Sequence, residues 1–199
     1  MNQNTGDQKR RRMTLNDVAA LAGVSAVTVS RALRRPEMVW GDLRQRIDAA
    51  VAELGYIPNQ LASALASSRT HRIGVIVPSL TNGLFGDLLR AVHDVFLPAG
   101  FQVLVLNSGY VAGREEKAIA TMLGQHPEAL IVTGIDQTEA SRRMLEQAAI
   151  PVVQTMELAD TPIDINIGLS QREAGYAATK FLIDLGHRQI GQISVPLDA

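Results

Sequence analysis

A short stretch near the amino terminus brings together side chains that can read the edges of DNA bases. From Ser25 to Arg31 the chain runs Ser-Ala-Val-Thr-Val-Ser-Arg. If the stretch is helical, four of these residues point away from the predicted core: Ala26, Val27, Ser30 and Arg31. Hydroxyl, methyl and guanidinium groups recognise bases in the major groove. The residue types in this stretch are therefore suited to recognising DNA bases.

Two short helices joined by a tight turn would position these side chains. Thr14 can cap a first helix, with Asp17 completing a capping box, and Gly23 can end that helix in the left-handed conformation. Ser25 is a suitable cap for the second helix. The inward residues are predicted to be Val18, Ala19, Ala22, Val24, Val29 and Leu33. This arrangement is typical of a DNA-binding helix-turn-helix, although an ordinary helical hairpin shows the same pattern.

A third helix over residues 42–54 is predicted to complete this small core and to end at Gly55. Its inward residues are Ile47, Ala50, Val51 and Leu54. Trp40 stands where a Ser or Thr cap is usual, and we expect its side chain to pack over the start of the helix instead of lying exposed beside DNA. We assign residues 13–58 to one helical domain, preceded by a disordered basic arm over residues 1–12.

Residues 59–72 are predicted to form a short helix followed by a linker. Asn59 can cap a helix of small residues, which is too short to be stable alone in water. Such a helix needs a partner surface. The polar run from Ser67 to Thr70 indicates a linker.

Charge is distributed unevenly along the chain. Of its 19 Lys and Arg residues and 20 acidic residues, residues 1–72 contain eleven bases and six acids, and the remainder contains eight bases and fourteen acids. A basic front and an acidic rear indicate a nucleic-acid module joined to a part that binds no polyanion.

Several classes of protein are excluded by composition and spacing. The chain has no cysteine, so it has no disulfide and no thiolate metal site, as expected in a reducing cytoplasm. It has no apolar run long enough to span a membrane, and its basic start is not followed by a signal-peptide core. The four histidines, His71, His93, His126 and His187, lack the spacing of metal ligands. We therefore expect no enzyme activity, no catalytic residues, no metal and no cofactor.

From residue 73 onward, apolar runs alternate with amphipathic segments. Strands are predicted at 73–78, 102–107, 129–134, 151–156, 164–168 and 189–194, and helices at 84–96, 114–125, 138–149 and 172–186. This rhythm predicts an α/β fold, a doubly wound parallel sheet with helices on both faces. Ligands of such sheets bind beyond the carboxyl ends of the strands. Polar residues follow those ends at 79–82, 107–108, 133–134 and 168–170.

The order of these parts resembles the lactose-repressor (LacI/GalR) family, from Thr14 to nearly the end of the chain. The segments PSLTNGLF (78–85), PVV (151–153) and DINIG (164–168) are most similar to repressors of gluconate utilisation. The resemblance implies an all-α headpiece with a periplasmic-binding-protein-like effector domain over residues 73–199. It also implies a homodimer on operator DNA, and control by a small metabolite such as a gluconate-like sugar acid.

The resemblance also implies roles for individual residues. Those facing the major groove or its flanking phosphates would be Ser25, Ala26, Val27, Thr28, Ser30 and Arg31. Thr14, Leu15 and Tyr56 would lie near the DNA backbone. Asn59 and Leu65 would belong to a hinge helix in the minor groove, with Leu65 as an apolar wedge between base steps. The effector site would include Asn82, Leu84, Phe85, Thr133 and Ser170.

The chain departs from the family pattern at several positions. Trp40 replaces a serine, Ser63 stands where arginine is common, and Leu169-Ser170 replaces an Asp-Asn pair. The family's effector domain has two lobes, so we expect a C-terminally truncated domain. In it, residues 164–193 would supply only the crossing into the second lobe, and the metabolite would bind weakly. Two alternatives are a sugar-binding protein and a dimerising DNA-binding module without effector control.

Overall fold

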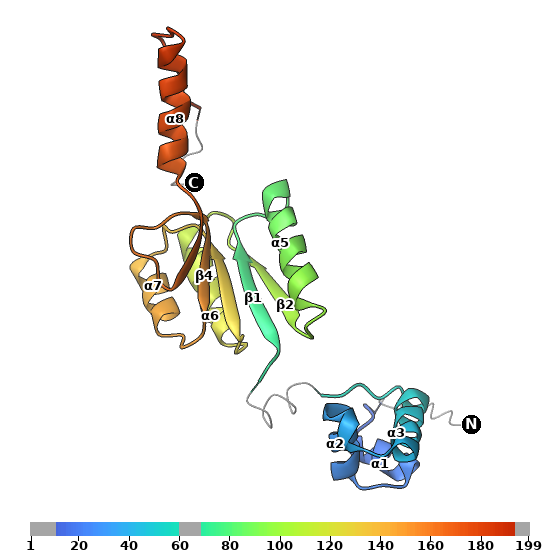
Figure 1. Ribbon diagram of the computed structural model, residues 1–199. Helices are drawn as coiled ribbons and strands as arrows, with labels where there is room; N and C mark the ends of the chain where they lie inside the picture. Colours follow the sequence, from blue (N-terminus) through green and yellow to red (C-terminus); the bar gives the residue numbers. More distant parts are fainter. Residues whose placement is uncertain (1–10, 60–68, 194–199) are drawn as a thin grey trace, which may run out of the picture. The chain divides into compact units, whose positions relative to one another are not determined.

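The computed structural model of the protein describes residues 11–59 and 69–193, which belong to two compact units (Figure 1). We call the first unit the headpiece and the second the sheet unit. Each has its own hydrophobic core. Within the described residues, no helix is both long and apolar enough to cross a membrane.

The headpiece contains three helices and one turn of 3-10 helix: α1 (Leu15–Ala22), α2 (Ala26–Arg34), η1 (Pro36–Met38) and α3 (Gly41–Leu54). The predicted capping box is present, since the Asp17 N–H donates to Thr14 Oγ1 at 3.4 Å and the Thr14 N–H to Asp17 Oδ2 at 2.8 Å. Ser25 caps α2 by accepting the Thr28 N–H at 3.2 Å. Gly23 and Gly55 end α1 and α3 with φ of 64° and 57°, as predicted.

The headpiece core consists of the predicted inward faces, with three differences, the first of which is that Ala32 is buried although it was not predicted to face inward. Its buried residues are Val18, Ala19, Ala22, Val29, Ala32, Ile47 and Ala50. Ala26, predicted to face outward, is half-buried against this core because it lies one turn before Val29 and next to the α1–α2 corner. The prediction for Trp40 is wrong, because its side chain is 87% exposed. Val39 and Leu43 pack on the core from either side of it, so the indole is left outside.

The sheet unit is a five-stranded parallel sheet in the order β2-β1-β3-β4-β5. The strands are β1 (Arg72–Val77), β2 (Gln102–Asn107), β3 (Ala129–Thr133), β4 (Val152–Glu157) and β5 (Ile165–Leu169). The helices are α5 (Gly83–Phe96), α6 (Ala112–Leu123), α7 (Glu139–Glu146) and α8 (Gln171–Asp184). The parallel α/β fold is confirmed. β5 pairs with β4 in this sheet, so it is not merely a crossing into another lobe.

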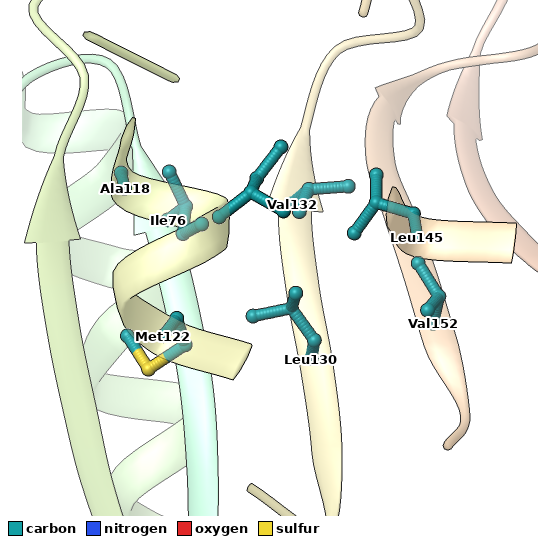
Figure 2. Packing of buried hydrophobic residues seen from close by; sticks show 8 residues of the cluster. Ile76, Ala118, Met122, Leu130, Val132, Leu145 and Val152 are labelled. Atoms are coloured by element: carbon teal, nitrogen blue, oxygen red, sulfur yellow. The ribbon is translucent and has the colours of Figure 1, made fainter. Parts of the chain in front are cut away.

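Helices cover both faces of the sheet (Figure 1). On one face α5 packs through Phe85 and Val92 against Val75 and Val77 of β1. On the other face α6 and α7 pack against β1, β3 and β4, as Figure 2 shows for Met122, Leu130 and Leu145 among others. Strand β1 is buried on both faces, which explains its continuous apolar sequence.

The end of the described chain differs from the prediction. Residues 189–193 form no strand, and residue 194 lies outside the described residues. A strand needs a neighbour that hydrogen-bonds to its backbone, and no described strand lies beside this segment. Helix α8 buries none of its residues against the described chain, and its Tyr176 and Phe181 side chains are exposed.

Candidate nucleic-acid interface and ligand-binding edge

The exposed face of α2 presents the side chains expected to read DNA. Val27 is 69% exposed and Arg31 is exposed, whereas Thr28 and Ser30 are half-buried. Within the part of the chain that the structure describes, the side chain of Arg31 has no hydrogen bond or ion pair. Its guanidinium is thus available to an acceptor from outside, such as the O6 and N7 atoms of guanine.

Arg34 is a further basic residue of this face, and the sequence reasoning did not single it out. It lies one turn after Ser30, and its guanidinium contacts the Ser30 hydroxyl while its Nε donates to the Ser30 carbonyl at 3.3 Å. The i, i+4 spacing of the two residues is the signal that could have revealed the contact. Arg31 and Arg34 place two positive charges at the end of α2.

Other arginines of the headpiece have structural contacts. Arg46 of α3 donates to the carbonyl of Ala22 at 2.6 Å, which ties α3 to the end of α1. Its guanidinium also lies 3.0 Å from the position that a Cβ would occupy at Gly23. Arg46 therefore holds the turn between α1 and α2, and its charge is partly satisfied there.

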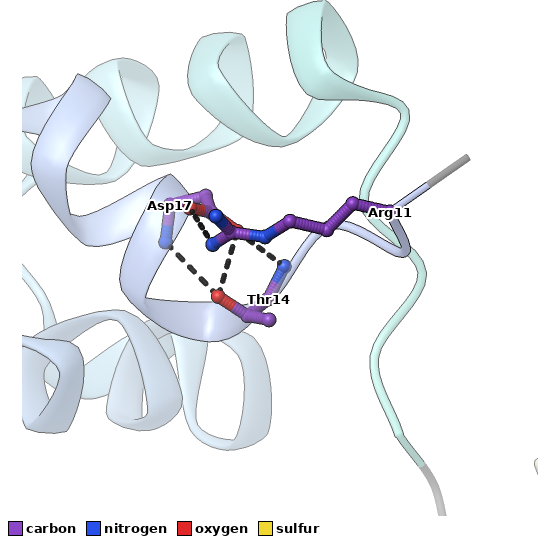
Figure 3. Close-up of polar contacts among 3 residues, drawn as sticks. All are labelled: Arg11, Thr14 and Asp17. Atoms are coloured by element: carbon purple, nitrogen blue, oxygen red, sulfur yellow. Dashed lines mark hydrogen bonds and ion pairs between the residues drawn. The ribbon is translucent and has the colours of Figure 1, made fainter. Parts of the chain in front are cut away.

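The amino end of α1 carries a compact polar cluster of Arg11, Thr14 and Asp17 (Figure 3). Arg11 Nη2 lies 2.9 Å from Asp17 Oδ1, and the Thr14 hydroxyl donates to Asp17 Oδ2 at 2.7 Å. Leu15 and Tyr56, which were also expected near the DNA backbone, are half-buried against the headpiece core. Asn59 is exposed, and Leu65 lies outside the described residues.

Acidification is expected to destabilise the headpiece through Asp17. The pKa of Asp17 is lowered from its ordinary value of 3.8, first by the hydrogen bond from the Thr14 hydroxyl, then by the Thr14 N–H. A carboxyl group with a lowered pKa stabilises the folded state above its unfolded value, and that contribution is lost as pH falls through the folded value.

We therefore expect the unfolding temperature of the headpiece to fall below about pH 4. The loss should be larger in the wild type than in Asp17→Asn, whose side chain does not titrate. NMR signals of residues 15–22 would follow the transition. Equal losses in the two proteins would exclude Asp17 as the titrating group.

The candidate ligand-binding residues lie at the carboxyl edge of the sheet, except Phe85, whose side chain is buried in the core. Asn82 caps α5 by accepting the Leu84 N–H at 3.1 Å, and the Leu84 side chain is exposed. The Thr133 hydroxyl, at the end of β3, donates to the Ile76 carbonyl at 3.1 Å. Because β1 and β3 are neighbours, Asn82 and Thr133 follow adjacent strand ends.

The remaining two candidates differ in position. Ser170 caps α8 by accepting the Glu173 N–H at 3.1 Å, and its strand β5 is separated from β3 by β4. Phe85 is 5% exposed and packs in the core between α5 and the sheet. Its ring therefore packs in one cluster with residues of β1 and β3, because the first turn of an amphipathic helix directs one side chain inward. As an apolar platform for a ligand, exposed Leu84 fits and Phe85 does not.

A polar network beside Thr133 was missed by the sequence reasoning. Gln154 of β4 is fully buried, donates to Gln137 Oε1 at 2.8 Å, and accepts the Ile163 N–H at 2.8 Å. Gln137 in turn donates to the Gly134 carbonyl at 3.1 Å. A glutamine within an apolar strand is the sequence signal for such a network, since a buried amide needs partners.

Acidic side chains accompany this network. Burial raises the pKa of Glu115, and the neighbouring carboxylates of Asp136 and Glu116 raise it further, against a lowering by the Gln137 amide. Glu116 accepts the Thr138 hydroxyl at 2.6 Å. This part of the carboxyl edge can donate few hydrogen bonds to an anion, but it can accept them from ligand hydroxyl groups. Among the described residues, no three His, Cys, Asp or Glu side chains are arranged to hold a metal ion.

Both units match models of known protein families. Residues 14–59 match the model described as bacterial regulatory proteins, lacI family. Residues 70–198 match the model described as periplasmic binding proteins and sugar binding domain of LacI family.

Curated relatives include two proteins named HTH-type transcriptional regulator GntR. The one from Pseudomonas aeruginosa is 44% identical over 188 residues, which cover 94% of this chain and 54% of the relative. The one from Escherichia coli K12 is 39% identical over 190 residues, which cover 96% of this chain and 57% of the relative. The chain thus spans about half the length of these relatives.

Solved structures give the same result. A LacI-family transcriptional regulator from Silicibacter pomeroyi matches with a TM-score of 0.82 and 40% identity, over 89% of this chain and 53% of that one. The lac repressor dimer bound to operator and the anti-inducer ONPF matches with a TM-score of 0.77 and 30% identity, over 95% and 58%. These similarities cover the headpiece and the sheet unit together.

Proposed function

Because the chain belongs to the lacI family of bacterial regulatory proteins, we propose that it is a sequence-specific DNA-binding transcriptional regulator, a repressor whose operator affinity is controlled by a small molecule. The observation that carries this proposal is the exposed face of α2, where the guanidinium of Arg31 has no partner among the described residues. A short capped helix with free polar groups is the element that helix-turn-helix proteins place in the major groove. Binding to chromosomal DNA would place the protein in the cytoplasm.

The DNA is expected to be a roughly palindromic operator bound by a homodimer. A dimer with two-fold symmetry presents two copies of α2, and it therefore recognises two inverted half-sites. The resemblance adds Asn59 and Leu65 as hinge residues in the minor groove between the half-sites. The relative of known structure that is described as a dimer on its operator supports this arrangement.

Arg31→Ala is expected to weaken operator binding by about 1–3 kcal/mol, the range for a well-formed contact between a side chain and a base. Binding to a random duplex should change much less, since it depends on phosphate contacts, and both affinities should fall steeply with salt. Gel-shift titrations would compare a palindromic duplex, selected from a random library by the full chain, with a random duplex.

Arg143→Ala is the matched control, because Arg143 is an exposed arginine on α7 of the sheet unit. It should leave both affinities unchanged. If the wild type bound selected and random duplexes equally at moderate salt, the chain would not be a sequence-specific regulator.

For the effector, we propose a polyhydroxylated sugar acid such as gluconate, bound at the carboxyl edge of the sheet. The support is the similarity of residues 78–85 to gluconate repressors and the polar groups of Asn82 and Thr133 at neighbouring strand ends, with Leu84 exposed near Asn82 in the chain. Ser170 follows β5 at the same edge. Carbohydrate sites combine an apolar surface with a few placed polar groups. The carboxylate of the ligand would lie away from Glu115 and Asp136, and its hydroxyl groups would meet that part of the edge.

Calorimetry with gluconate, ribose and cellobiose, combined with gel shifts at saturating ligand, tests the effector proposal. A shift in operator affinity with gluconate alone supports a sugar-acid effector. A response to ribose or cellobiose would retain effector control and overturn the ligand class. If no metabolite changed operator affinity, the chain would be a dimerising DNA-binding module without effector control.

A further inference from the structure

The segment that leads into β1, residues 69–72, contacts the carboxylate of Glu128 at the amino edge of the sheet. Its Oε2 accepts hydrogen bonds from Arg69 Nε at 3.3 Å and Arg69 Nη2 at 3.1 Å. Its Oε1 accepts the backbone N–H of His71 at 2.8 Å. The backbone N–H of Glu128 donates to the carbonyl of Arg72 at 2.7 Å. A single residue therefore contacts three of the four residues from 69 to 72.

Strand β2 and the loop before β3 also contact this segment, and the Gln102 N–H of β2 donates to the His71 carbonyl at 2.7 Å. The Thr70 hydroxyl donates to the His126 carbonyl at 2.6 Å, and Arg72 Nη1 donates to the Gln125 carbonyl at 3.2 Å. The carbonyl partners belong to the backbone, so their contacts survive most substitutions. Glu128 accepts its hydrogen bonds through its side chain, so a substitution at 128 removes them without changing any of residues 69–72.

The place of Glu128 in the register explains its effect. Pairing between β1 and β3 begins at Ile73 opposite Ala129. Glu128 precedes that first β1–β3 pair, so its side chain contacts the incoming chain ahead of β1–β3 pairing, beside the β1–β2 pairing that begins at Arg72 opposite Gln102. The residues it holds are the ones that connect residues 59–68 to the sheet.

The ionised form of Glu128 is favoured. Partial removal from water raises the pKa of Glu128, but the hydrogen bond from the His71 N–H and the adjacent Arg69 guanidinium together bring it below its ordinary value of 4.5. The carboxylate is therefore charged at neutral pH, when it can accept from both partners.

We propose that Glu128 is a positioning residue for operator binding, which fixes where the chain from the headpiece joins the sheet. The proposal rests on the regulatory function proposed above. Two half-sites at a set spacing are bound together only if each headpiece is tethered at a defined point and over a defined length. Loosening residues 69–71, which precede β1, lengthens the tether and widens the volume that each headpiece samples, so simultaneous binding of two half-sites weakens.

Glu128→Gln and Glu128→Ala test the proposal, with Glu146→Gln and Glu146→Ala as matched controls. Glu146 is also a partly exposed carboxylate paired with an arginine, Arg142 at 2.8 Å, but it lies on α7 and contacts none of residues 69–72. The glutamine at 128 keeps the shape and an acceptor for the His71 N–H, and it removes the charge opposite Arg69. The Glu128→Gln variant therefore keeps the test decisive if Glu128→Ala fails to fold.

The first measurement is the rate at which trypsin cleaves the full chain after Arg69, without DNA. We expect cleavage to be several-fold faster in Glu128→Ala, intermediate in Glu128→Gln, and unchanged in both Glu146 variants. The second measurement is affinity for the selected palindromic duplex and for a random duplex. We expect a loss of roughly twofold to threefold for the palindrome, because effective concentration falls as about the −3/2 power of tether length. The random duplex should change less, since phosphate contacts set no half-site spacing.

The outcomes separate the two proposals. Unchanged cleavage in both Glu128 variants would show that the carboxylate does not restrain the segment, and faster cleavage with unchanged operator affinity would show that the restraint does not matter for binding. Either result overturns the positioning role and leaves the regulatory function intact. A wild type without preference for any selected duplex would overturn the regulatory function, and the positioning role with it.

Discussion

Replacing Ile47 by alanine should unfold the headpiece and leave the five-stranded sheet folded. Ile47 is fully buried at the centre of the core that joins α1, α2 and α3. Truncating a buried isoleucine costs about 2–5 kcal/mol of folding free energy. A domain of this size has little stability to lose, because small domains bury a small fraction of their surface. Operator binding should disappear as a result.

NMR spectra of the full chain would show this directly, since signals of residues 15–54 should collapse while those of the sheet unit persist. Ile57→Ala is the matched control, because Ile57 is an isoleucine of the same unit that is 73% exposed. It should leave the spectrum nearly unchanged. Simultaneous loss of the signals from both units would contradict the separation into two independent cores.

Gly74→Val should have the converse effect and destabilise the sheet unit alone. A Cβ at Gly74 would lie 2.6 Å from Met122 Cγ and 2.7 Å from Leu130 Cδ1, in the core between β1 and α6. Overpacking of a filled core costs about 1–3 kcal/mol. Because β1 lies between β2 and β3, its displacement would weaken pairing on both sides.

Thermal unfolding and hydrogen exchange of β1 to β3 would measure the loss. Gly113→Val is the matched control, since a Cβ at Gly113 of α6 would meet nothing within 4 Å. Met122→Ala in the Gly74→Val protein should recover part of the stability by making room. A Gly74→Val protein as stable as the control would show that the core between β1 and α6 has room to spare.

Local signals in the sequence predicted most of the fold. The caps at Thr14 and Ser25 and the left-handed glycines Gly23 and Gly55 act within a few residues, so they could be identified without knowledge of the tertiary structure. The strands and helices from β1 to α8 were likewise located within a few residues of their bounds. Each has a strong apolar period of its own.

The errors arose where distant residues decide the outcome. Trp40 was expected to pack, but its neighbours Val39 and Leu43 pack on the core and its own side chain is exposed. Residues 189–193 have the composition of a strand, but no described strand is there to pair with them. A sequence shows how apolar a residue is, but it does not show which distant residues or strands will contact it in the fold.

The candidate site was predicted less completely than the fold. The edge of the sheet follows from βα alternation, so Asn82 and Thr133 could be placed there. The inward turn of Phe85 and the network of Gln137 and Gln154 depend on side-chain contacts between elements far apart in the chain. Such contacts leave only weak signals, such as a single glutamine within an apolar strand.

The exposed indole of Trp40 decides what optical spectroscopy can report about this protein. It is the one tryptophan of the chain, so tryptophan emission arises from the headpiece alone. With 87% of the residue in contact with solvent, its emission should resemble that of indole in water and should be quenched readily by iodide. A change in emission on adding a sugar would therefore signal an event at the headpiece, and silence would say nothing about whether the sugar had bound to the sheet unit.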